Sequence, residues 1–101
     1  MKIEIPNIEL VALFFSTNSC GACAPIGIQI EEAMEKKFAK IAYLKVRLED
    51  NPELRGKYMV FSAPTFILLV DGKEYMRESG VFSVIGLLGK IERIYNQINS
   101  D

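Results

Sequence analysis

Apolar residues follow three kinds of pattern along this chain, and each kind predicts a different element. Residues 10–15 are a continuous apolar run of strand length, which is typical of a strand covered on both faces. Residues 41–48 alternate between apolar and polar side chains, which predicts a second strand. Residues 66–70 are another strongly apolar run, and they predict a third.

Two segments repeat apolar residues every three or four positions, the spacing of one helix face. The first segment starts near Cys20 or Gly21 and runs to Lys40. Pro25 lies early in it and is expected to bend or tighten its first turn. The second starts after Ser83, a residue type that caps helices, and its glycines, Gly86 and Gly89, are expected to mark close packing on the sheet. Its apolar face is Val84, Leu87, Leu88, Ile91, Ile94, Tyr95 and Ile98.

Shorter signals fill the rest of the chain. Asp50-Asn51-Pro52 predicts a helix start with a capping side chain and Pro at the first position, and this short helix is expected to end near Gly56 or Lys57. Asp71-Gly72 predicts a two-residue hairpin, followed by an edge strand over residues 73–78 that Gly80 ends. Residues 1–9 are expected to be an edge strand or a loosely held arm.

The elements therefore follow the order β, α, β, α, β, β, α. Strands separated by helices predict parallel pairing, and the hairpin adds an antiparallel edge. The expected fold class is α/β, a three-layer sandwich with a mixed central sheet of about four strands flanked by helices. A length of 101 residues predicts one domain over residues 1–101.

Composition narrows the possible functions. A net charge of −1 offers no basic field for nucleic acid and no polybasic patch for a membrane. No apolar run approaches the ~20 residues that a membrane-spanning helix needs, and the N-terminus does not read as a signal peptide. Two cysteines without such a signal indicate a cytoplasmic protein. The chain has no His, which excludes Cys–His catalysis and His metal ligands.

The two cysteines, Cys20 and Cys23, lie between a predicted strand and a predicted helix, which is a redox arrangement. The positive end of the helix favours a thiolate at Cys20, the attacking species in disulfide exchange. Cys23 lies about one helical turn further on, within reach of a mixed disulfide formed at Cys20. Two buried structural cysteines, or a zinc site shared between two chains, are the alternatives.

These residues, taken together, resemble the thioredoxin family. A strand leads into the cysteine pair at a helix start, and Ala63-Pro64-Thr65, Asp71-Gly72 and Gly80 follow at compatible spacings. Lys45 matches a buried lysine of the family, and Asn51-Pro52 matches the start of its middle helix. The resemblance covers the chain from about Leu10 to its end.

The resemblance implies a thiol–disulfide oxidoreductase with the thioredoxin-like fold. Cys20 would attack, Cys23 would resolve, and Gly21, Ala22 and Lys45 would support them. Pro64 would follow a cis peptide bond, and Ala63, Pro64, Thr65 and Gly80 would bind a substrate segment. The implied partners are disulfide-containing proteins and an electron-donating reductase, with no nucleic acid, membrane, metal or cofactor beyond the Cys20–Cys23 disulfide. The protein is expected to be a monomer.

Several residues depart from the family pattern. Ser19 and Ala22 replace the usual Trp before the first cysteine and the usual Pro between the two cysteines. Phe14 stands where the family has a buried Asp that accepts the proton of the resolving cysteine, and a phenyl ring cannot do this. These departures keep open an alternative: a binding or adaptor module whose cysteines are structural or redox-sensing.

Overall fold

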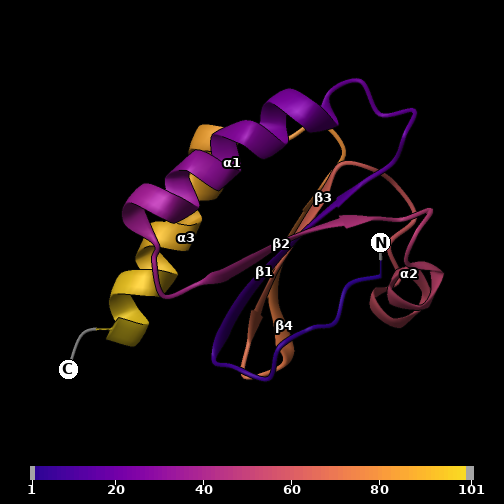
Figure 1. Cartoon of the computed structure of the whole chain (residues 1–101). Coiled ribbons are helices and arrows are strands. Elements are labelled where there is room, and N and C mark those ends of the chain that lie inside the picture. The colour runs from indigo at the N-terminus through magenta and orange to yellow at the C-terminus, as the bar shows by residue number, and fades with distance from the viewer. Residues whose placement is uncertain (1, 100–101) are drawn as a thin grey trace.

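Four strands form one mixed sheet in the order β2-β1-β3-β4 in the computed structural model, which describes residues 2–99 (Figure 1). The expected sheet of about four strands is thus confirmed. β1 pairs in parallel with β2 and antiparallel with β3, and β3 pairs antiparallel with β4. The strands are β1 (Leu10–Ser16), β2 (Ala42–Arg47), β3 (Thr65–Val70) and β4 (Lys73–Ser79).

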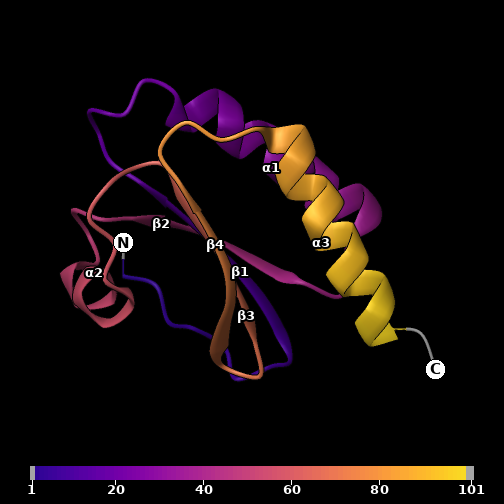
Figure 2. The ribbon, with the colours of Figure 1, turned by 180° about the vertical axis from the view of Figure 1, so that it is seen from behind.

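Three helices flank the sheet and complete the three layers. The helices are α1 (Cys23–Lys37), α2 (Pro52–Tyr58) and α3 (Val84–Asn99). α1 and α3 lie side by side on one face of the sheet, while α2 lies apart from them on the other side (Figures 1 and 2). The expected three-layer α/β sandwich is therefore confirmed.

The central strand β1 supplies both halves of the core, which explains its unbroken apolar sequence. Leu10, Ala12 and Phe14 are buried among residues of α1 and α3. The alternate residues, Val11, Leu13 and Phe15, are buried in a second cluster that includes side chains of α2. Burying apolar surface on both faces holds the strand, and with it the segment that follows Ser16, in a fixed place.

The direction of β3 differs from the prediction that helix-separated strands run parallel. Arg47, at the end of β2, pairs with Ser16, and Thr65, at the start of β3, pairs with Phe15. The connection through α2 therefore begins and ends at the same end of the sheet, so β3 must run back against β1. α2 has only 7 residues, too short to carry the chain along the sheet to its far end.

The first helix begins later than expected. α1 starts at Cys23, with Ala22 as its N-cap, so Cys20 precedes the helix. Pro25 then falls in the first turn, where its missing N–H removes no helical hydrogen bond. The reason given for a bent or tightened turn, the loss of a helical hydrogen bond at Pro25, therefore does not apply. The helix also ends at Lys37, before the predicted Lys40.

The Asn51 side chain joins the N-terminal segment to the end of β2 instead of capping α2. Pro52 is at the first position of α2 as predicted, but the Asn51 side chain makes no capping hydrogen bond. Its Oδ1 accepts the N–H of Ile3 at 2.7 Å, and its Nδ2 donates to the carbonyl of Arg47 at 2.9 Å. Residues 2–9 form no strand, so the predicted edge strand is absent from this segment, and Ile3 and Ile5 pack against the core cluster that includes Val11.

α3 follows its predicted pattern, except at its glycines. Ser83 caps the helix, with Oγ accepting the N–H of Gly86 at 3.0 Å, and Leu87 and Ile91 are buried. Close packing does not explain the glycines. A Cβ at Gly89 would meet nothing within 4 Å, and one at Gly86 would make only ordinary contacts of 3.5 Å with Ser83.

Two glycines with the same open surroundings provide a test of the backbone geometry. Gly72, in the hairpin, has a φ of +80°, whereas Gly89 lies within α3. Gly72→Ala is expected to lower the free energy of unfolding by about 1 kcal/mol, because a side chain is disfavoured at positive φ. Gly89→Ala is expected to raise it by up to about 1 kcal/mol through helix propensity. Urea unfolding of both variants measures the difference, and changes of the same sign would contradict this account.

Candidate active site

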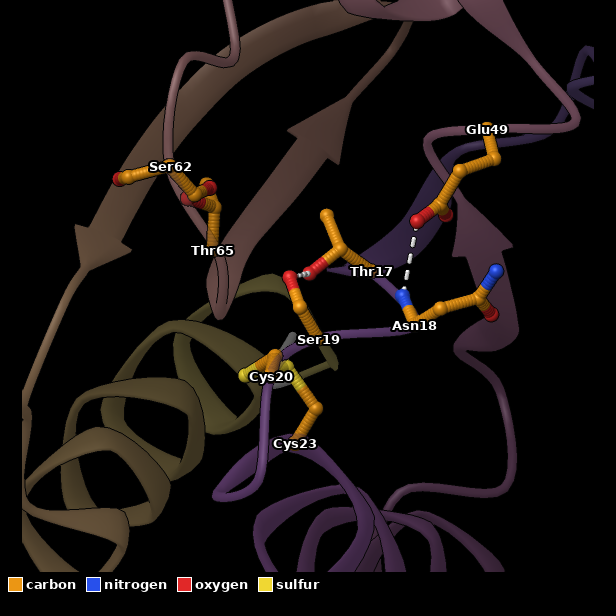
Figure 3. The surroundings of a disulfide bond; sticks show 8 residues. All are labelled: Thr17, Asn18, Ser19, Cys20, Cys23, Glu49, Ser62 and Thr65. Atoms are coloured by element: carbon orange, nitrogen blue, oxygen red, sulfur yellow. Dashed lines mark hydrogen bonds between the residues drawn. A yellow bond between two sulfur atoms is a disulfide. The ribbon is translucent and has the colours of Figure 1, made fainter.

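A disulfide bond joins Cys20 to Cys23 where the chain passes from β1 into α1 (Figure 3). The Cα atoms of the two residues are 5.5 Å apart. Cys23 is 5% exposed, whereas Cys20 is only half-buried. Of the two sulfur-bearing residues, Cys20 is therefore the one that a partner reaches first.

The segment around the cysteines, residues 17–22 (the cysteine loop), is a series of tight turns. The N–H of Cys20 donates to the carbonyl of Thr17 at 3.3 Å, and the N–H of Cys23 donates to the carbonyl of Cys20 at 3.3 Å. Cys20 lies just before the N-terminus of a helix of 15 residues, whose positive end favours a thiolate over a thiol.

The cysteine loop is also held from the side by β2 and the segment that follows it. Glu49 Oε2 accepts the backbone N–H of Asn18 at 2.8 Å, as Figure 3 shows, and Arg47 donates to Asn18 Oδ1 at 2.5 Å. The hydrogen bond from Asn18 lowers the pKa of the Glu49 carboxyl below its usual value, with smaller contributions from the N–H of Glu49 itself and from Arg47. The sequence analysis missed Glu49, because nothing in the local pattern relates residues 31 positions apart.

The predicted substrate-binding residues come together at the start of β3. The Ala63–Pro64 peptide bond is cis, as the resemblance implied. The N–H of Gly80 donates to the carbonyl of Pro64 at 3.0 Å, and Thr65 Oγ1 donates to the carbonyl of Ser62 at 2.7 Å. Because Thr65 pairs with Phe15, this segment lies next to the end of β1 from which the cysteine loop departs.

Two exposed apolar side chains lie close in sequence to the predicted substrate-binding residues. Phe61, two residues before Ala63, is 72% exposed, and Val81, directly after Gly80, is fully exposed. Large apolar side chains in such positions are candidates for contact with a partner rather than for the core.

A cleft of about 420 Å³ opens beside the disulfide. Cys23, Phe14 and Lys45 are among the residues that line it. None of the lining residues from the described part of the chain is an Asp or Glu, so these residues offer Cys23 no carboxylate as proton acceptor. Its lining is Phe14, Ser16, Thr17, Asn18, Cys20, Cys23, Ala24, Gly27, Ile28 and Lys45.

Lys45 is not buried, contrary to what the resemblance implied. Its side chain is 57% exposed and its ammonium lies 3.1 Å from Glu31 Oε1. β2 is an edge strand, so no further strand covers Lys45, and its neighbour in the β1 register is the ring-bearing Phe14 rather than an acid. Its partner Glu31 is itself 39% exposed, so the ion pair lies at the surface.

Residues 2–99 contain neither a metal-binding cluster nor a membrane-spanning helix. No group of three or more His, Cys, Asp or Glu side chains in this range could hold a metal ion. No helix in the same range is both long and apolar enough to cross a membrane.

Comparisons with known proteins agree with this geometry. Residues 2–93 match the family model described as Thioredoxin. The thioredoxin H-type proteins of Picea mariana and Fagopyrum esculentum are 39% and 32% identical over 73 and 72 residues. These segments cover 72% and 71% of this chain, but only 58% and 61% of the relatives, so the chain spans about three fifths of their length.

A solved structure supports the same assignment. The X-ray structure of Fasciola hepatica thioredoxin superposes with a TM-score of 0.75 at 32% identity, covering 84% of this chain and 80% of that one. The family model spans most of the chain, and the fold and the paired cysteines fit it. The chain therefore belongs to the thioredoxin family.

Proposed function

We propose that this protein is a thiol–disulfide oxidoreductase that reduces or exchanges disulfide bonds in other proteins. One observation carries the proposal: a half-exposed Cys20 and a buried Cys23, already paired as a disulfide, lie at the start of α1 and next to the Ala63–Pro64 segment. A cysteine pair with this difference in exposure suits a reaction in which one thiol attacks a partner and the other resolves the product.

The reaction begins with the reduced pair. The Cys20 thiolate attacks one sulfur of a substrate disulfide, forming a Cys20–substrate mixed disulfide and releasing the other substrate sulfur as a thiolate. Cys23 then loses its proton, to water in the cleft beside it, and attacks the Cys20 sulfur. This releases the second substrate thiolate and forms the Cys20–Cys23 disulfide. Two electrons pass from the protein to its substrate, and an electron-donating reductase must return them.

The substrate is an extended segment of a disulfide-containing protein, bound along Ala63, Pro64, Thr65 and Gly80 by strand-like backbone contacts. The exposed Phe61 and Val81, which both lie beyond the paired residues Pro64 and Gly80, would add apolar contacts beside this surface. A surface of this kind binds its partner through main-chain hydrogen bonds, so it accepts many amino-acid sequences around the substrate disulfide.

The remaining residues and properties belong to the same proposal. Gly21 and Ala22, which separate the cysteines, would set the balance between dithiol and disulfide. Lys45 would act at the rim of the cleft as an exposed positive charge near Cys23. We place the protein in the cytoplasm as a monomer that uses no cofactor besides its own disulfide and binds neither nucleic acid nor membrane.

Insulin reduction tests this function directly. With dithiothreitol as electron donor, the protein is expected to accelerate the precipitation of insulin chains in proportion to its concentration. Protein reduced and then alkylated with iodoacetamide is the matched control, because its accessible thiol, Cys20, is then blocked. An unmodified protein no faster than its alkylated form would contradict the proposal and favour the adaptor alternative.

A further inference from the structure

The parallel pairing of β1 and β2 extends one step beyond the strands themselves. Arg47 pairs with Ser16 at the end of both strands, and the N–H of Leu48 then donates to the carbonyl of Ser16 at 2.9 Å. In a regular parallel ladder the next hydrogen bond would run from the N–H of Asn18 to the carbonyl of Leu48.

That next hydrogen bond is not formed, because the chain turns toward α2. The carbonyl of Leu48 instead accepts the N–H of Asn51, at 3.2 Å. The N–H of Asn18 donates to Glu49 Oε2 at 2.8 Å, so a carboxylate takes the place of the missing backbone acceptor. A charged acceptor makes a stronger hydrogen bond than a carbonyl oxygen does.

The N–H of Asn18 belongs to the same peptide group as the carbonyl of Thr17, and that carbonyl accepts the N–H of Cys20 at 3.3 Å. Because a peptide group is planar, fixing its N–H also fixes the direction of its carbonyl. The Glu49 carboxylate, whose hydrogen bond with Asn18 is drawn in Figure 3, and the Cys20 backbone therefore hold opposite ends of one rigid unit.

The side chain of Asn18 has a second restraint. Arg47 donates to its Oδ1 at 2.5 Å, and the same guanidinium lies 3.7 Å from Asp50. Arg47 is the last residue of β2, and Glu49 lies two residues further along the chain. The side chain and the backbone of Asn18 are therefore both anchored at this end of β2.

We propose that Glu49 is a positioning residue for Cys20: its carboxylate fixes the Thr17–Asn18 peptide group, whose carbonyl in turn holds the backbone of Cys20. This inference rests on the proposed oxidoreductase function for its importance, but its geometry can be tested without any substrate.

Three variants separate positioning from charge. Glu49→Ala removes the acceptor, and Glu49→Gln removes the charge but keeps an oxygen that can accept the Asn18 N–H. Glu53→Ala is the matched control, because Glu53 lies nearby on α2, pairs with Lys2 at 3.2 Å and changes the net charge equally.

Amide hydrogen exchange in the oxidised protein is the first measurement. Exchange at Asn18 and Cys20 is expected to be about three- to tenfold faster in Glu49→Ala, the range that follows from losing the net stabilisation of one ordinary hydrogen bond at an exposed position. Glu49→Gln is expected to stay within about twofold of the unmodified protein, because its amide oxygen still accepts. Equal exchange in Glu49→Ala and Glu53→Ala would overturn the proposal.

Insulin reduction is the second measurement. Glu49→Ala is expected to lower kcat/KM about threefold, and Glu49→Gln to restore most of it. A pure charge effect would instead make the two Glu49 variants equal, which would also overturn positioning. If the unmodified protein reduces no insulin while the exchange rates differ as expected, the oxidoreductase function fails and the positioning by Glu49 stands.

Discussion

Cys20→Ser and Cys23→Ser are expected to fail in different ways. Cys20→Ser is expected to lose insulin reduction entirely, because Cys23 is 5% exposed and cannot meet a protein disulfide. Cys23→Ser is expected to keep the first half of the reaction and to accumulate mixed disulfides through Cys20, because a serine hydroxyl cannot attack them. Non-reducing electrophoresis and mass spectrometry after incubation with a disulfide-containing protein measure the difference.

The control for this experiment is the double variant Cys20→Ser/Cys23→Ser, which should form no mixed disulfide at all. Adducts on Cys23 in the Cys20→Ser variant would contradict the assignment of Cys20 as the attacking residue. If neither single variant forms adducts although the unmodified protein reduces insulin, the two-step mechanism itself is wrong. Because Cys20→Ser is expected to lose insulin reduction completely, even a modest residual rate of reduction would contradict the assignment of Cys20 as the attacking residue.

The sequence alone predicts most of the secondary structure, because the apolar pattern of each element reflects the faces it buries. Residues 10–15 form a continuous apolar run since β1 contributes to both halves of the core. Asp71-Gly72 predicts its hairpin correctly, since both residues adopt the positive φ that this turn requires. Both features depend on residues that are close together in the sequence, so the sequence alone can predict them.

The errors that bear on the site concern relationships between distant segments. The direction of β3 depends on where the α2 connection ends, which the residues of β3 do not encode. The exposure of Lys45 depends on β2 being at the edge of the sheet. The contact between Glu49 and Asn18 depends on a ladder that the turn into α2 interrupts. Each of these needs the assembled fold.

Phe14→Ala is expected to cause the largest loss of stability among single core changes near the site. Phe14 is 2% exposed, and its ring lies 3.2 Å from the place where a Cβ on Gly27 would be. Truncating a buried phenyl ring costs about 3–5 kcal/mol in the free energy of unfolding. The total free energy of unfolding of a domain is about 5–15 kcal/mol, so the variant is expected to fold with a much smaller free energy of unfolding. Urea unfolding, with the slope of the transition unchanged, measures the loss.

Phe61→Ala is the matched control, because the same truncation at a side chain that is 72% exposed should change the unfolding free energy by no more than about 0.5 kcal/mol. A loss below about 1 kcal/mol for Phe14→Ala would show that the ring is not part of the core.

The Phe14→Ala variant also bears on the chemistry of Cys23. Phe14 lines the cleft beside Cys23 with apolar surface, and removing its ring makes room for more water next to a thiol that must lose a proton. Mixed disulfides on Cys20 should therefore resolve faster in Phe14→Ala, even as the fold weakens, because the residue that stabilises this end of the core also limits how much water reaches the resolving cysteine.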